Sequence, residues 1–240
     1  REGALTAMNA WAADLAVVGL VKKPDGILSL WFVRRPGGAA LHREDHTCIL
    51  EDVDPSPGFN NDFKTQLVAM ALGTVAPLAK TEARSQVLEK ALTDTGNKIK
   101  NLLKSGRIKE PLRLVKLHNA HGIVLRSLGE LKGESEWFAQ AANSYNEALV
   151  LLKREDQPVA WAQMQTRLGG ALGILGGMEN DRERLIQAVA ALNAALTVHT
   201  QTDTPIDWAN TQNNLGNALH ALGHLEESTE RLEQARLVLK

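Results

Sequence analysis

The chain has 240 residues, of which 44% are hydrophobic and 23% are charged, and this balance is typical of a folded globular protein and argues against disorder. Because 27 Lys and Arg face 28 Asp and Glu, the net charge is -1, and we expect no nucleic-acid partner. The single cysteine, Cys48, excludes an internal disulfide framework. The length predicts one large domain or two small ones.

We expect no membrane span in this chain. The longest charge-free stretch, residues 185–202, is interrupted by polar side chains. The chain begins at Arg1 without a methionine, and its first 21 residues lack the basic and then apolar layout of a signal peptide. We therefore expect a piece of a longer protein. The compartment is left open, with the cytoplasm favoured over the periplasm.

Residues 1–78 are predicted to form a partial α/β region. Two apolar, β-rich runs are joined by a turn composition with Pro24 and Gly26, which predicts a hairpin. A third strand is expected at 46–51, after Pro36, and a final amphipathic helix ends before Pro77. The expected elements are a helix at 4–13, strands at 15–21, 27–34 and 46–51, and a helix at 63–76. Residues 79–108 then form a connecting helix that ends at Gly106.

An internal repeat of 47 residues organises the second half of the chain. Leu-Gly pairs at 168–169 and 215–216 have Gly122 as their counterpart, and Pro111, Pro158 and Pro205 keep the same spacing. Proline suits the first turn of a helix, so each unit is predicted to start a helix there and to end it at Gly129, Gly176 and Gly223. Three helical hairpins are expected, over residues 109–155, 156–202 and 203–240.

The run Leu215 to Leu219, followed by Gly223 and Ala235, resembles the tetratricopeptide repeat pattern, with both connections lengthened. The N-terminal region is similar to the later part of the TolB-like α/β domain, on residues 17–23, 30–33 and 63–77. The resemblance implies a bacterial scaffold. The predicted fold class is therefore α+β but mainly α: a stack of antiparallel helical hairpins with a small N-terminal antiparallel sheet.

Motifs for catalysis and for cofactor binding are absent from the sequence, which has no P-loop, no zinc-protease motif, no C-x-x-C pair and no serine elbow. We therefore predict no enzyme and no cofactor. His220 and His224, like His118 and His121, could share an ion on one helical face, but no third ligand accompanies either pair. Packed or surface histidines are favoured, and no metal is predicted.

The tetratricopeptide resemblance implies a concave groove lined by the first helix of each hairpin. A peptide or protein segment is expected to bind there, with an acidic or C-terminal segment favoured by the cations and with Asn amides contacting its main chain. The residues implied to line the groove are Lys116, Asn119, Ala120, Ile123 and Arg126; Gln163, Thr166, Arg167, Gly170 and Gly173; and Asn210, Asn213, Asn214, Asn217 and His220.

Three alternatives stay open. The asparagines could cap helices or simply face water. The last hairpin, which ends in apolar residues including Leu237 and Leu239, could associate with a second copy of the chain to form a homo-oligomer. The N-terminal region could also be the sensor or regulatory part of a larger bacterial protein.

Overall fold

A computed structural model of the whole chain describes residues 15–22, 28–34, 48–49, 69 and 82–239. The chain divides into two compact units, Arg1–Leu67 and Val68–Lys240, and each unit is described by itself. The helix predicted at 4–13 lies outside the described residues, and so does the helix predicted at 63–76 apart from Ala69.

In the first unit the backbone forms three short strands in the order β1-β2-β3. These are β1 (Leu15–Lys22), β2 (Leu28–Arg34) and β3 (Cys48–Ile49). β1 and β2 are antiparallel, with a register irregularity between Val17 and Gly19, and β3 pairs antiparallel with β2 through Trp31 and Phe32. Glycine without a side chain is common at such irregularities in a strand.

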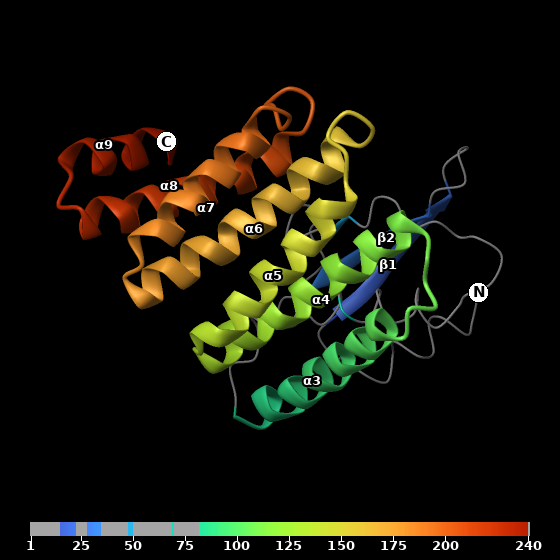
Figure 1. Cartoon of the computed structure of the whole chain (residues 1–240). Helices are drawn as coiled ribbons and strands as arrows, with labels where there is room; N and C mark the ends of the chain where they lie inside the picture. The colour runs from blue at the N-terminus through green and yellow to red at the C-terminus, as the bar shows by residue number, and fades with distance from the viewer. Residues whose placement is uncertain (1–14, 23–27, 35–47, 50–68, 70–81, 240) are drawn as a thin grey trace. The chain divides into compact units, whose positions relative to one another are not determined.

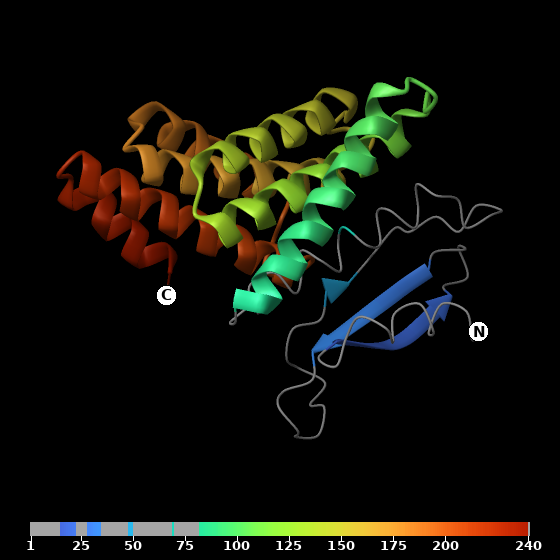
Figure 2. The same ribbon diagram turned by 90° about the horizontal axis from the view of Figure 1, so that it is seen from below.

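The second unit is a stack of helices that follow one another in chain order (Figures 1 and 2). Each helix packs against the next, and α6 also packs against α8. The helices are α3 (Glu82–Lys104), α4 (Pro111–Lys132), α5 (Ser135–Leu151), α6 (Pro158–Glu179), α7 (Arg182–Leu196), α8 (Pro205–Leu225) and α9 (Thr229–Val238).

The predicted α+β fold class is wrong, and the class is mainly α. From residue 82 to residue 239, where the backbone and nearly all side chains are described, the chain forms seven α-helices and no strand. Apart from Ala69, the described hydrophobic core comes entirely from these helices and their connections. The apolar faces that meet in this described core belong to amphipathic helices.

The prolines begin helices as predicted, but the expected helix ends are displaced. Pro111, Pro158 and Pro205 open α4, α6 and α8, where the missing N–H costs no hydrogen bond. α4 and α6 continue past the glycines that were expected to end them, and stop instead at Gly133 and Asn180, which both adopt left-handed backbone conformations.

The glycines of the 47-residue pattern lie where the two helices of a hairpin come closest. A methyl group added at Gly169 would lie 2.5 Å from Cγ of Leu192, and one added at Gly176 would lie 2.9 Å from Cγ of Leu185. The other hairpins repeat this arrangement at equivalent positions, with Gly122 against Tyr145, Gly129 against Phe138, Gly216 against Leu239 and Gly223 against Leu232. These positions need glycine because a second side chain already fills the space.

Candidate protein-binding surface

The first helices of the second and third hairpins, α6 and α8, meet directly along a seam of small and polar residues. Nε2 of Gln163 donates a hydrogen bond to Asp207 at 3.4 Å, and the hydroxyls of Thr166 and Thr211 lie 2.9 Å apart. Further along, a methyl group at Gly170 would meet the Asn214 amide at 3.3 Å, and one at Gly173 or Gly177 would meet Ala218 or Ala221. Small residues allow two helices to approach this closely.

This seam accounts for several of the predicted groove residues. Gln163, Thr166, Gly170 and Gly173 on α6 and Asn214 on α8 face the neighbouring helix. The sequence signal that could have separated them is the spacing: the residues at 163, 166, 170, 173 and 177 recur alternately every three and four positions, as in a helix-helix seam.

The remaining predicted residues of α8 form an open polar face. Asn210, Asn213, Asn217 and His220 are all exposed, and their spacing of three or four residues places them on one side of the helix. His220 contacts His224 one turn later, with ring centroids 4.4 Å apart and Nε2 atoms 3.1 Å apart.

On α4 the predicted residues are more enclosed. Lys116 and Asn119 are partly buried, and Oδ1 of Asn119 is buried without a hydrogen-bond partner among the described residues. Arg126 forms an ion pair with Glu130 one turn later, at 2.6 Å, so its charge is already matched. Ala120 is buried in the core cluster between α3 and α4, away from any ligand, and Ile123 is partly buried.

Tyr145 of α5 interacts with residues of both α4 and α6. Its ring is fully buried over Gly122, and its hydroxyl has no partner in hydrogen-bonding geometry among the described residues. Burial raises the pKa of this phenol, and the positive charges of Arg167 on α6 and Arg126 on α4 act in the opposite direction. The pKa of the Tyr145 hydroxyl is therefore affected by guanidinium groups from two different helices, α4 and α6.

The histidines of α4 are packed rather than free. Nδ1 of His121 lies 2.9 Å from the hydroxyl of Ser144 on α5. Burial, together with the charges of His118 and Lys100, lowers the pKa of His121 to about 4. Burial also lowers the pKa of His118, against the opposing charge of Glu147. Burial therefore favours the neutral form of both imidazoles.

A buried polar chain that sequence reasoning missed supports the turn into α8. His199 is 1% exposed, and its Nδ1 lies 3.1 Å from the hydroxyl of Thr211, which also donates to the carbonyl of Asp207 at 2.6 Å. Desolvation lowers the pKa of His199. These contacts hold the connection between α7 and α8 against the first turns of α8, while Nε2 of His199 is buried without a hydrogen-bond partner among the described residues.

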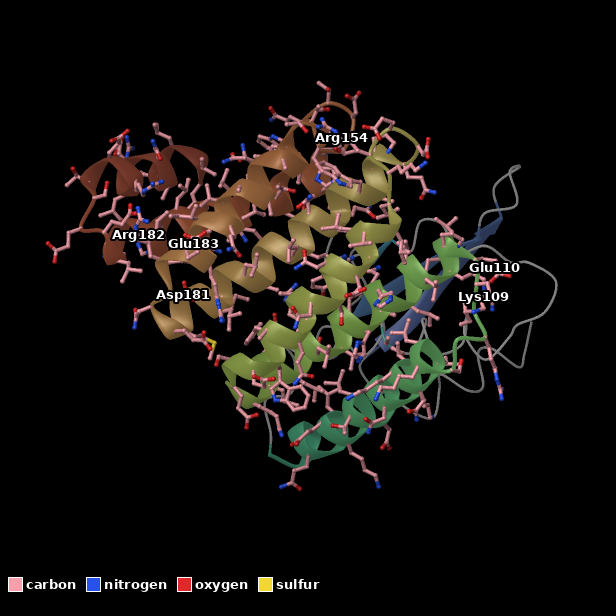
Figure 3. All side chains as sticks on the ribbon, viewed as in Figure 1. Lys109, Glu110, Arg154, Asp181, Arg182 and Glu183 are labelled. Atoms are coloured by element: carbon pink, nitrogen blue, oxygen red, sulfur yellow. The ribbon has the colours of Figure 1, made fainter. Side chains whose placement is uncertain are left out.

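Polar contacts between consecutive hairpins recur with the sequence period. Ser135 donates to Glu179 at 2.9 Å, and Arg182, the equivalent residue of the next hairpin, pairs with Glu226 at 2.6 Å. Figure 3 shows Arg182 at the turn between α6 and α7, with Arg154 in the connection at the opposite end of α6. One hydrogen bond and one ion pair at equivalent positions therefore link the hairpins along this edge.

Other kinds of site are sparse in the part of the chain that the structure describes. No group of three or more metal-ligating His, Cys, Asp or Glu side chains occurs between residues 82 and 239. Within the same described part, no helix is both long and apolar enough to cross a membrane. A hollow of about 350 Å³ lies between the ends of α6 and α8; its lining comprises Gly176, Gly177, Asn180, Leu185, Ala221, His224 and Leu225.

Comparison with models of known families, with curated proteins and with solved structures finds no match for this chain.

Proposed function

We propose that α4 to α9 are three tetratricopeptide-like hairpins that act as a non-catalytic scaffold for protein binding. The proposal is supported by the recurrence of one packing arrangement: in each hairpin the same two glycines of the first helix lie against the second helix. Prolines at equivalent positions open all three first helices. A stack of such units offers an extended surface on which a peptide can lie.

The observation that carries the binding assignment is the environment of Arg167. This side chain is partly buried, and no carboxylate of the described residues forms an ion pair with it. Its charge acts instead on the buried hydroxyl of Tyr145. A cation that is withdrawn from water without a counter-charge is unfavourable, and a carboxylate from a partner would offset that cost. An acidic side chain or a C-terminal carboxylate is therefore the ligand group that this position favours.

The exposed face of α8 supplies a different kind of contact. The amides of Asn210, Asn213 and Asn217 each donate and accept hydrogen bonds and are free to meet the main chain of an extended segment. Lys116 on α4 adds another cation to the proposed surface. The resulting arrangement is a charged end at α4 and α6 and a neutral hydrogen-bonding end at α8.

We expect the full chain to select acidic peptides from a displayed library of random 12-residue sequences with free C-termini. Arg167→Gln should weaken binding of the selected peptides at least tenfold, because it removes a partly buried cation with which no carboxylate of the described residues forms an ion pair. Affinity is measured by fluorescence anisotropy on synthetic peptides, each paired with a version in which Gln and Asn replace Glu and Asp and an amide replaces the C-terminal carboxylate.

Lys109→Gln is the matched control, since it removes one positive charge from the exposed loop before α4 (Figure 3). It should leave the affinity within about twofold, because a distant surface charge is screened. Equal weakening by both variants, or equal affinity for the acidic and the neutral peptides, would sink the assignment of the carboxylate contact. Replacing Asn210, Asn213 and Asn217 together by Ala tests separately whether the α8 face takes part.

Self-association is a second candidate function, favoured by the apolar side chains exposed in and beside the last hairpin. Leu237 is 59% exposed, Leu239 is 50% exposed and Leu225 is 37% exposed. If this surface joins two copies, sedimentation velocity should report a dimer that Leu237→Glu converts to a monomer. A chain that is monomeric at every concentration up to about 100 μM, where micromolar association would be evident, contradicts this function.

A further inference from the structure

A pair of histidines on α8 has a geometry that helix packing does not explain. His220 and His224 are both exposed and one turn apart, and their rings meet edge to face with the Nε2 atoms 3.1 Å apart. Each ring has the other as its only hydrogen-bond partner among the described residues. The equivalent positions of α6 are Gly173 and Gly177, which face α8.

The distance between the two Nε2 atoms matches the distance between two nitrogen ligands of one metal ion. At a Zn–N distance of about 2.0–2.1 Å, two imidazole nitrogens lie about 2.9 Å apart at a right angle and about 3.4 Å apart at the tetrahedral angle. The observed 3.1 Å falls between these two values. Histidines at positions i and i+4 also share one helical face, so a single ion reaches both without any change in the backbone.

A small change of the side chains is enough to turn both nitrogens toward one ion. In the metal-free pair one Nε2–H donates to the other Nε2, so the two rings hold opposite tautomers. Metal binding requires both rings to carry the proton on Nδ1, which leaves two Nε2 lone pairs for the ion. The χ2 torsion of histidine is broad, so the required rotation is inexpensive.

We propose that His220 and His224 form a two-histidine site on α8 for a divalent transition metal ion with an affinity for imidazole, of which Zn²⁺ is the representative. The protein supplies two ligands, and water fills the other positions. Both imidazoles are exposed, so solvent can supply those waters. The bound ion bridges one turn of α8 and stabilises the end of this helix.

The test is a calorimetric titration of the full chain with Zn²⁺, in a reference variant that carries His42→Asn, His46→Asn and Cys48→Ser. Those three residues are other potential ligands; Cys48 belongs to β3, and the two histidines lie outside the described residues. The expected result is one ion per chain, with at least a tenfold loss of affinity in His220→Asn and in His224→Asn, because a single imidazole loses the chelate effect. Cu²⁺ should give an electron paramagnetic resonance spectrum with two nitrogen ligands in the reference variant and fewer in either single variant.

A histidine pair moved to another position on α8 provides the control for folding. In the His220→Asn/His224→Asn background, adding Asn213→His and Asn217→His places two histidines four residues apart on the same exposed face. This variant should recover Zn²⁺ binding and shows that the substituted chain is folded. The proposal is overturned if the reference variant binds no Zn²⁺ while the relocated pair does, or if the His220→Asn/His224→Asn chain binds Zn²⁺ as tightly as the reference variant.

Discussion

Replacing Leu192 by alanine is expected to lower the free energy of unfolding by about 2–5 kcal/mol, the range found when a fully buried leucine leaves a cavity. Leu192 is 0% exposed and belongs to the core cluster that joins α7 to α8 and α9. Its side chain also lies directly over Gly169 of α6. The measurement is denaturation by urea followed by circular dichroism.

Leu237→Ala is the matched control, because Leu237 is 59% exposed and the same substitution there should change the stability by no more than about 0.5 kcal/mol. A second variant tests the packing directly. A methyl group at Gly169 would meet Leu192, so Gly169→Ala should destabilise the native chain but cost less in the Leu192→Ala background, where space has been opened. Strictly additive effects of the two substitutions would contradict this close packing.

The sequence predicted where α4, α6 and α8 begin, because the signals for the start of a helix are local. Proline at a fixed first position, followed by apolar residues at helical spacing, defines a helix without reference to the rest of the chain. The ends of the helices were harder to predict, because glycine is also the residue that commonly ends a helix. Gly176 and Gly223 are glycines for another reason: the side chains of Leu185 and Leu232 leave no room for a side chain there. Only the tertiary contact distinguishes these two uses of glycine.

The candidate surface was less predictable because helix pairing decides which residues remain open. Asn213 and Asn214 are neighbours of the same type, yet Asn213 is exposed and Asn214 lies against Gly170 of α6. Nor does the sequence reveal that the hydroxyl of Tyr145 is buried near Arg167, since these residues come from different hairpins. The α+β fold class was wrong for a related reason. The β-rich runs near the N-terminus were interpreted as a sheet that defines the fold, whereas the described core is made of helices.

The stability of the chain is expected to fall as the pH is lowered from about 6.5 towards 4, and His121 should account for on the order of 2 kcal/mol of that loss. Burial, reinforced by His118 and Lys100, lowers the pKa of His121 in the folded state to about 4, from an ordinary value of 6.5. Within this window the unfolded chain binds a proton that the folded chain does not. Protonation therefore favours unfolding, and the contribution is fully present only above about pH 6.5.

The check is a series of urea denaturations between pH 4 and pH 7.5 on the native chain and on His121→Gln, whose amide keeps a hydrogen-bonding group near Ser144. The carboxylates titrate in both proteins and cancel in the difference. The two curves should converge as the pH falls, because the native chain alone loses stability through this imidazole. His118 and His199, whose pKa values are also lowered by burial, are present in both proteins. Parallel curves would show that His121 is as easily protonated in the folded chain as in the unfolded one, in conflict with its packing between α4 and α5.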